Sequence, residues 1–93
     1  MGEFRVEITE IAKKQIEKHV KSGNKASIKK IATILKELSE TPYTGSGKPE
    51  ALKENLTGFW SRQINAKDRL IYTVNEHLVI VDVVSAMGHY SDK

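Results

Sequence analysis

The spacing of apolar residues changes twice along this chain of 93 residues, and those changes limit the folds open to it. Residues 4–8 alternate apolar and charged side chains, which is typical of a half-buried strand. Residues 10–38 carry apolar side chains at helical spacing, and residues 59–86 return to strand-like segments joined by short polar turns. The element order is therefore β-α-α-β-β-β, which predicts an α+β fold.

Two amphipathic helices are predicted in the first half of the chain. The first spans about residues 10–21, follows the N-cap Thr9, and ends at the break Ser22-Gly23-Asn24. Asn24 caps the second helix, which stops before Thr41-Pro42. The apolar stripes consist of Ala12, Ile16 and Val20 in the first helix, and of Ile28, Ile31, Leu35 and Leu38 in the second. A break this short favours an antiparallel helix hairpin.

The second half of the chain predicts three antiparallel strands, at about residues 59–64, 69–75 and 78–86. Their polar connections, residues 65–68 and 75–77, have the length of hairpin loops. The last strand is nearly continuous in apolar residues, so we expect it to be central in the sheet, with the helices covering one face. The predicted architecture is a two-helix hairpin packed on an antiparallel-dominated sheet.

Composition narrows the class of protein. A chain of this length forms about one small domain, so we expect residues 1–93 to be a single domain. The lack of cysteine excludes a disulfide framework and cysteine-ligated zinc or iron–sulfur sites. No apolar run approaches the roughly 20 residues of a membrane span, and the N-terminus lacks the basic-then-apolar order of a signal peptide. These features predict a cytoplasmic protein with no membrane partner.

Positive charge is concentrated in the helical region. Residues 10–40 contain eight lysines against four glutamates, within a net charge of +3 for the whole chain. A basic helical region fits a polyanionic partner such as RNA. A lysine-rich face that is merely solvated fits the same pattern equally well.

The stretch from Gly45 to Arg69 carries the most chemistry. It opens as a glycine-rich loop, which we expect to lead into a short helical turn over residues 49–56. In that turn the carboxylate of Glu50 lies between Lys48 and Lys53 in sequence. A carboxylate among cations, just before a strand, suits the handling of phosphate. The three histidines lack metal-ligand spacing, so neither a metal site nor a cofactor is expected.

A set of ordered motifs over about residues 40–90 resembles the YoeB/Txe branch of the RelE superfamily of bacterial toxins. The motifs are Thr41-Pro42-Tyr43, Gly47-Lys48-Pro49-Glu50-Ala51-Leu52-Lys53, Asn55-Leu56-Thr57-Gly58-Phe59-Trp60-Ser61-Arg62, Arg69-Leu70-Ile71-Tyr72 and His89-Tyr90. The resemblance implies a RelE-like microbial RNase fold and an endoribonuclease that cuts mRNA in the ribosomal A site. It also implies a cognate antitoxin as partner, and it leaves a homodimer open.

The resemblance implies a role for each site residue. Metal-free RNA cleavage needs a base for the 2′-hydroxyl proton, a cation for the phosphorane and an acid for the leaving 5′-oxygen. These roles fall to Glu50, Arg69 and His89, with Tyr90 as a positioning or stacking group. The expected RNA or phosphate contacts are Lys48, Lys53, Arg62 and Gln63. Each residue alone has a structural explanation, and Trp60 is expected to pack in the core or at its rim.

Two departures from the family pattern affect the site. Relatives carry two arginines after Trp-Ser, whereas this chain has Arg62-Gln63, and it continues for three residues beyond Tyr90. If strand alternation places position 63 on the face of the catalytic groups, one phosphate-binding cation is replaced by a neutral amide.

Two other classes of function remain open from the sequence. A non-enzymatic ParE-like toxin that acts on DNA gyrase would have the same element order but would not need Glu50, His89 or Tyr90. A plain RNA-binding module is less favoured, because the chain lacks the aromatic-rich strand pair of an RNA-recognition motif.

Overall fold

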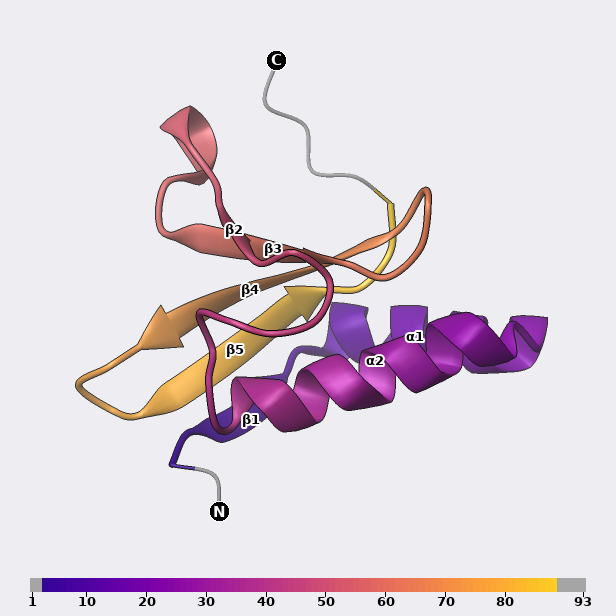
Figure 1. The fold of residues 1–93 in the computed structure, drawn as a ribbon, viewed down its shortest axis with the longest axis horizontal. Coiled ribbons are helices and arrows are strands. Elements are labelled where there is room, and N and C mark those ends of the chain that lie inside the picture. Colours follow the sequence, from indigo (N-terminus) through magenta and orange to yellow (C-terminus); the bar gives the residue numbers. More distant parts are fainter. Residues whose placement is uncertain (1–2, 89–93) are drawn as a thin grey trace.

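The structure, a computed structural model, describes residues 3–88, and these form two helices and a five-stranded sheet (Figure 1). In chain order the elements are β1 (Arg5–Ile8), α1 (Glu10–Ser22), α2 (Lys25–Leu38), β2 (Glu50–Ala51), the 3₁₀ helix η1 (Glu54–Leu56), β3 (Phe59–Gln63), β4 (Arg69–Asn75) and β5 (Ile80–Ser85). No helix among the described residues is long and apolar enough to cross a membrane.

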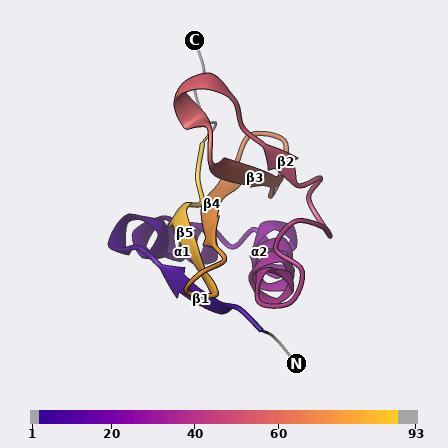
Figure 2. The ribbon, with the colours of Figure 1, turned by 90° about the vertical axis from the view of Figure 1, so that its left-hand side faces the viewer.

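The sheet is mixed and mostly antiparallel, with the strand order β1-β5-β4-β3-β2 (Figure 2). β2, β3, β4 and β5 pair antiparallel, whereas β1 pairs parallel to β5. The parallel pair is possible because the chain leaves β1 through both helices before it returns to the sheet. The predicted α+β fold is confirmed, and β5 lies inside the sheet between β1 and β4.

Both helices begin at the predicted caps. The Thr9 Oγ1 accepts a hydrogen bond from the Ala12 amide at 3.2 Å, and the Asn24 Oδ1 accepts one from the Ser27 amide at 3.1 Å. Each cap satisfies a backbone donor that has no partner within the helix. Gly23 ends α1 with φ 77°, a left-handed conformation that favours glycine.

The buried face of α1 differs from the predicted stripe. Val20 was expected in the core, but it is 55% exposed, and His19 is buried instead at 4%. His19 turns inward because its ring has a polar partner in the interior, the carbonyl oxygen of Ala86 at 2.8 Å. A hydrogen-bonded imidazole can therefore replace an apolar residue on the inner face.

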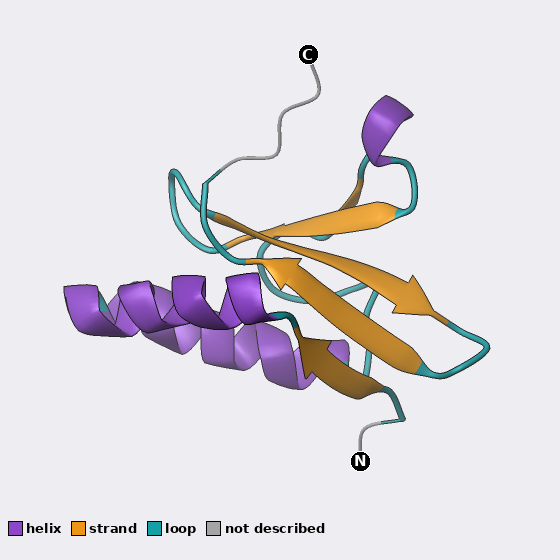
Figure 3. Cartoon of the chain, turned by 180° about the vertical axis from the view of Figure 1, so that it is seen from behind, coloured by secondary structure: helices purple, strands orange, loops and turns teal. Residues whose placement is uncertain are grey.

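The core lies between the helices and the sheet. α2 contributes Ile31, Ile34 and Leu38, which are all nearly or fully buried, and β4 contributes Leu70 and Tyr72. Seen along the sheet in Figure 2, α1 lies beside β5 and α2 lies apart from it, below β3. Seen from behind, η1 lies at the end of the sheet far from both long helices (Figure 3). β3 is joined to α2 through the contact of Arg62 with Glu37.

The chain forms strand β2 where a helical turn was predicted over residues 49–56, and only Glu54–Leu56 is helical, as 3₁₀. Backbone pairing along β3 explains the difference. The Gln63 amide donates to the Gly47 carbonyl at 2.6 Å, and the Leu52 amide donates to the Phe59 carbonyl at 2.9 Å. These bonds hold the segment extended against β3 and leave too few residues for a longer helix.

The last strand begins later than predicted, at Ile80 and not at residue 78. Leu78 is 65% exposed, and its amide donates to the Asn75 Oδ1 at 3.0 Å in the turn that follows β4. The side-chain hydrogen bond makes these residues part of the hairpin turn in spite of their apolar composition.

We expect Gly47→Ala to destabilise the fold by about 1–3 kcal/mol. Gly47 has φ 81°, and an added Cβ would lie 2.7 Å from the backbone oxygen of Gln63, which cannot move without disturbing β3. Gly58→Ala is the matched control, since Gly58 has φ 98° but open space around it. Urea unfolding of both variants measures the difference, and equal losses would show that the close approach to β3 has no cost.

Candidate active site

Strand register places three of the predicted site residues on one face of the sheet. Glu50 in β2 pairs with Ser61 in β3, and Gln63, two residues further along β3, pairs with Arg69 in β4. Paired residues project to the same side of a sheet, and residues two apart in a strand share a face. Glu50, Gln63 and Arg69 therefore lie on a common face, which we call the catalytic face after the roles predicted for Glu50 and Arg69.

The spacing on the catalytic face suits a single phosphate group. Strands lie about 4.8 Å apart and rise about 3.4 Å per residue, so the Cα atoms of Glu50 and Arg69 are roughly 12 Å apart. Glu50 is exposed, and Gln63 and Arg69 are half-buried. The long side chains of Glu50 and Arg69 can thus approach one group from opposite sides, with Gln63 between them.

The C-terminal end of the described chain lies next to Arg69. The Arg69 amide donates a hydrogen bond to the Gly88 carbonyl at 3.0 Å. The predicted residues His89 and Tyr90 fall outside the described residues. The chain therefore reaches residue 88 beside a predicted phosphate-binding cation, one position before the predicted general acid.

Lys48 and Lys53 both lie on the surface, on either side of β2 in the chain. Lys48 has φ 53°, a left-handed conformation that is uncommon for a residue with a side chain. Lys53 immediately precedes η1. Both ammonium groups are thus free of the core, as a contact to an RNA backbone requires.

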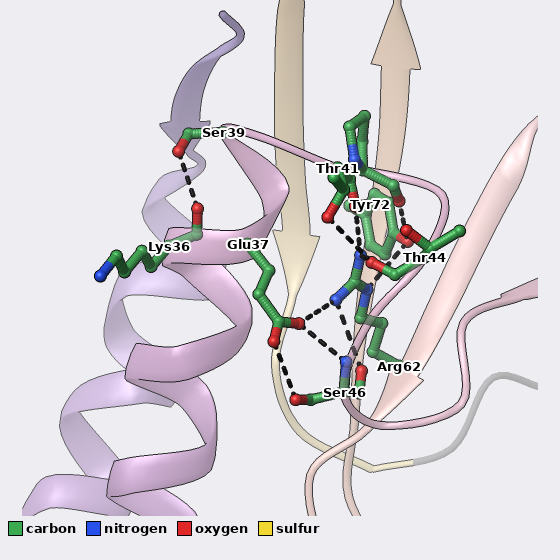
Figure 4. Close-up of polar contacts among 9 residues, drawn as sticks. Lys36, Glu37, Ser39, Thr41, Thr44, Ser46, Arg62 and Tyr72 are labelled. Atoms are coloured by element: carbon green, nitrogen blue, oxygen red, sulfur yellow. Dashed lines mark hydrogen bonds and ion pairs between the residues drawn. The ribbon is translucent and has the colours of Figure 1, made fainter. Parts of the chain in front are cut away.

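Arg62 is not available to bind phosphate in this structure, which corrects the prediction for this residue. It lies on the opposite face from Gln63, is fully buried, and is held by hydrogen bonds within the chain (Figure 4). Its Nη1 contacts the Glu37 carboxylate at 2.7 Å, and its Nε donates to the Tyr72 hydroxyl at 3.2 Å. Its remaining bonds are to the backbone carbonyls of Thr41, Thr44 and Ser46.

The charges around Arg62 shift the pKa values of its neighbours. Burial alone would raise the pKa of Glu37, but hydrogen bonds from Ser46 and the adjacent Arg62 guanidinium outweigh it and lower that pKa. Burial raises the pKa of Tyr72, against an opposing effect of Arg62. Glu37 is therefore charged and Tyr72 neutral at pH 7, so that Tyr72 can accept from Arg62 and donate to the Pro42 carbonyl at 2.7 Å.

Gln63 stands where the family pattern has a second arginine. The strand register shows on which face of the sheet this position lies. Position 63 pairs directly with Arg69 on the catalytic face, whereas position 62 points into the interior. Strand alternation thus places position 63 on the face of Glu50 and Arg69, so a neutral amide lies where the family pattern has a cation. This chain consequently has one positive charge fewer on this face than the family pattern would give it.

Trp60 packs at the rim of the core, as predicted. Its ring centroid lies 5.1 Å from that of Tyr43, and it contacts the buried cluster from a half-buried position. The Tyr43 hydroxyl donates to the Glu76 carboxylate at 2.6 Å, which raises the pKa of Tyr43 to about 12. This contact attaches the loop after α2 to the end of β4.

Sequence reasoning missed Glu37 and Ser61. Glu37 lies on the inner side of α2 between Ile34 and Leu38, and an acid at that position of an apolar stripe indicates a buried cation. Ser61 lies on the catalytic face next to Glu50, and its hydroxyl is buried without a hydrogen-bond partner. Nothing in the sequence distinguishes this serine from any other strand serine. Within residues 3–88 no group of three acidic, histidine or cysteine side chains could hold a metal ion.

We expect Glu37→Gln to destabilise the fold by about 3 kcal/mol at pH 7, because it leaves the buried Arg62 without a counter-charge. Glu17→Gln, an exposed change on α1, should cost less than about 0.5 kcal/mol. The pKa of Glu37 is lower in the folded chain than in the unfolded chain, so its charge favours folding at neutral pH. That contribution to stability begins to fall when the pH drops below the ordinary pKa of Glu37 in the unfolded chain. It is lost as the pH passes through the lowered pKa of the folded chain.

The difference in unfolding free energy between wild type and Glu37→Gln should therefore shrink as the pH is lowered. Denaturant titrations at several pH values between neutral and strongly acidic measure this difference. A gap that stays constant with pH would contradict the role assigned to the Glu37 charge.

Comparison with known proteins shows the family of this chain. The family model for the YoeB-like toxin of bacterial type II toxin-antitoxin systems matches residues 13–90. A toxin YoeB from Synechocystis is 40% identical over 68 residues, which cover 73% of this chain and 77% of the relative.

Solved structures give the same result. The YoeB dimer from Staphylococcus aureus has a TM-score of 0.78 at 35% identity, covering 95% of this chain and 99% of that one. The heterotetrameric YoeB-YefM toxin-antitoxin complex from the same organism has a TM-score of 0.75 at 35% identity, covering 94% and 98%. The chain therefore belongs to the YoeB-like toxins of bacterial type II toxin-antitoxin systems, a family of ribosome-dependent mRNA endoribonucleases.

Proposed function

We propose that this chain itself cuts mRNA in the ribosomal A site, with Glu50 as general base, Arg69 as phosphorane stabiliser and His89 as general acid. The observation that carries the proposal is the catalytic face, where register brings Glu50 and Arg69 together and where the chain arrives at Gly88. Family membership makes the gyrase-directed, ParE-like alternative wrong.

The reaction is an internal transfer of the phosphodiester. Glu50 takes the proton of the 2′-hydroxyl, and the 2′-oxygen forms a bond to the adjacent phosphorus as the bond to the 5′-oxygen breaks. His89 gives its proton to the departing 5′-oxygen, so the products are a 2′,3′-cyclic phosphate and a free 5′-hydroxyl. Arg69 stabilises the extra negative charge of the phosphorane. Electrostatic stabilisation of this kind is usually the largest single contribution to catalysis.

The surface lysines contribute binding more than chemistry. Lys53 is the proposed phosphate contact, with Lys48 nearby in the chain, and both are exposed. Tyr90 positions or stacks on the RNA. Arg62 holds the loop before β2 in place and does not contact RNA. At position 63, where the family pattern has an arginine, this chain has the neutral Gln63.

The proposed partners follow from the relatives. Because a Staphylococcus aureus YoeB is held in a complex with YefM, we expect a cognate antitoxin to bind and restrain this chain. A dimer is a second form, as in the other structure from that organism. The substrate is ribosome-bound mRNA, which places the activity in the cytoplasm.

We expect Glu50→Gln and His89→Gln each to lower the cleavage rate by about 10²–10⁴, because each removes one positioned proton-transfer group. Primer extension on translated mRNA measures the cuts. Glu54→Gln is the matched control, an exposed carboxylate four positions further along the chain, and it should cut at the wild-type rate. Full activity of Glu50→Gln at equal protein level would contradict the assignment of the base.

We expect Gln63→Arg to increase the cleavage rate about tenfold, because it adds a cation beside Arg69 where the phosphorane charge develops. It should also steepen the dependence of ribosome affinity on salt by about one phosphate contact. Thr33→Arg adds the same charge on the exposed side of α2 and controls for net charge. Equal gains from both variants would show that overall charge is responsible, and position 63 is not.

A further inference from the structure

Three side chains that the mechanism does not use converge on the backbone of residues 86–88. The Gln15 Oε1 accepts a hydrogen bond from the Ala86 amide at 2.7 Å. The His19 Nε2 lies 2.8 Å from the Ala86 carbonyl, and because a carbonyl only accepts, His19 is the donor. The Asp68 Oδ1 accepts from the Gly88 amide at 2.9 Å. We call Gln15, His19 and Asp68 the C-terminal anchor.

Two members of the C-terminal anchor, His19 and Asp68, are buried, whereas Gln15 is half-buried. His19 is 4% exposed, Asp68 is 7% exposed, and Ala86 is fully buried. The side-chain amide of Asn65 donates from its Nδ2 to the Asp68 Oδ2 at 3.1 Å and to the Ser27 hydroxyl at 2.8 Å. Burial alone would raise the pKa of Asp68, but the hydrogen bonds from Gly88 and Asn65 and the charges nearby lower it. Asp68 therefore accepts as a carboxylate at neutral pH.

These bonds connect elements that are distant in sequence. Gln15 and His19 are in α1, and Asp68 is in the turn between β3 and β4. β5 ends at Ser85, so residues 86–88 lie beyond its ladder, and the side chains supply the partners that a strand would otherwise give. The Gly88 carbonyl, in turn, accepts from the Arg69 amide. The segment is thus attached to α1 on one side and to the catalytic face on the other.

We propose that Gln15, His19 and Asp68 are positioning residues that fix the backbone of Ala86–Gly88 and thereby set where the chain continues to His89 relative to Arg69. This inference rests on the proposed function, in which His89 is the general acid. A catalytic group that is misplaced by about 1 Å can cost 10²-fold in rate, so the backbone that carries it must be held firmly. The alternative is that the three side chains only satisfy buried polar groups and stabilise the fold.

Matched pairs of variants separate the two possibilities. In His19→Gln the side-chain amide can still donate a hydrogen bond to the Ala86 carbonyl, whereas His19→Leu has a side chain of similar size but no donor. Gln15→Glu retains the acceptor, whereas Gln15→Met removes it. Single-turnover cleavage of ribosome-bound mRNA is measured over a range of ribosome concentrations at a temperature where thermal unfolding shows every variant to be folded.

We expect His19→Leu and Gln15→Met to lower the maximal rate about 10- to 100-fold while the half-saturating ribosome concentration stays within about twofold. His19→Gln and Gln15→Glu should restore the rate to within about threefold of wild type. Rates that follow stability alone, with the two members of each pair equal at equal folded fraction, would overturn the positioning role. A change confined to the half-saturating concentration would overturn it as well.

Amide hydrogen exchange keeps the inference distinct from the proposed function. In the wild-type chain the amides of Ala86 and Gly88 should be protected, and Asp68→Ala should increase exchange at Gly88 at least tenfold while the amides of β3 keep their protection. Fast exchange at both amides in wild type would overturn the anchor even if the chain cuts mRNA. Protected amides in a wild-type chain that does not cut ribosome-bound mRNA would instead overturn the proposed function, and the catalytic role of the anchor with it.

Discussion

The buried guanidinium of Arg62 is the interaction on which the site depends. It contacts the end of α2 through Glu37 and the loop after it through the carbonyls of Thr41, Thr44 and Ser46. Removing such a charge from water is costly unless every donor finds a partner, and here the loop supplies those partners. The loop in turn brings Gly47 against Gln63 and starts β2, which carries Glu50. A fully buried residue thus determines where Glu50, the proposed general base, lies.

Two neighbouring residues of β3, Arg62 and Gln63, lie in different environments because side chains alternate between the two faces of a sheet. Arg62 faces inward, where a charge needs enclosure, and Gln63 faces the catalytic face, where a charge would aid catalysis. The family pattern that the sequence resembles has arginine at both positions, so this chain retains the cation that the fold needs. The cation that it lacks is the one that the proposed reaction would use. A change at position 63 can therefore alter the proposed site without disturbing the buried contacts of Arg62.

The sequence predicts local features well and distant ones poorly. The caps Thr9 and Asn24 and the turn between β3 and β4 depend on neighbouring residues, and the structure confirms them. The strand β2, the parallel pairing of β1 and the burial of His19 depend on partners far along the chain, so no local pattern reports them. For the site, the residue types of Glu50 and Arg69 are visible in the sequence, but their common face follows only from register. The roles of Glu50, Arg69, His89 and Tyr90 all stay predictions.

The pairing of β1 with β5 has a consequence for how the molecule is made. β1 precedes every other described element, but its only partner among the described strands, β5, is synthesised after all the other described strands. Chains form their early elements during synthesis, and contacts that join distant segments close late. Helices α1 and α2 can form before β5 is made, but the ladder of β1 and the hydrogen bond from Arg69 to Gly88 must wait until residues 80–88 have been synthesised. A nascent chain therefore cannot complete its sheet, or attach residue 88 beside Arg69, until translation has passed residue 88.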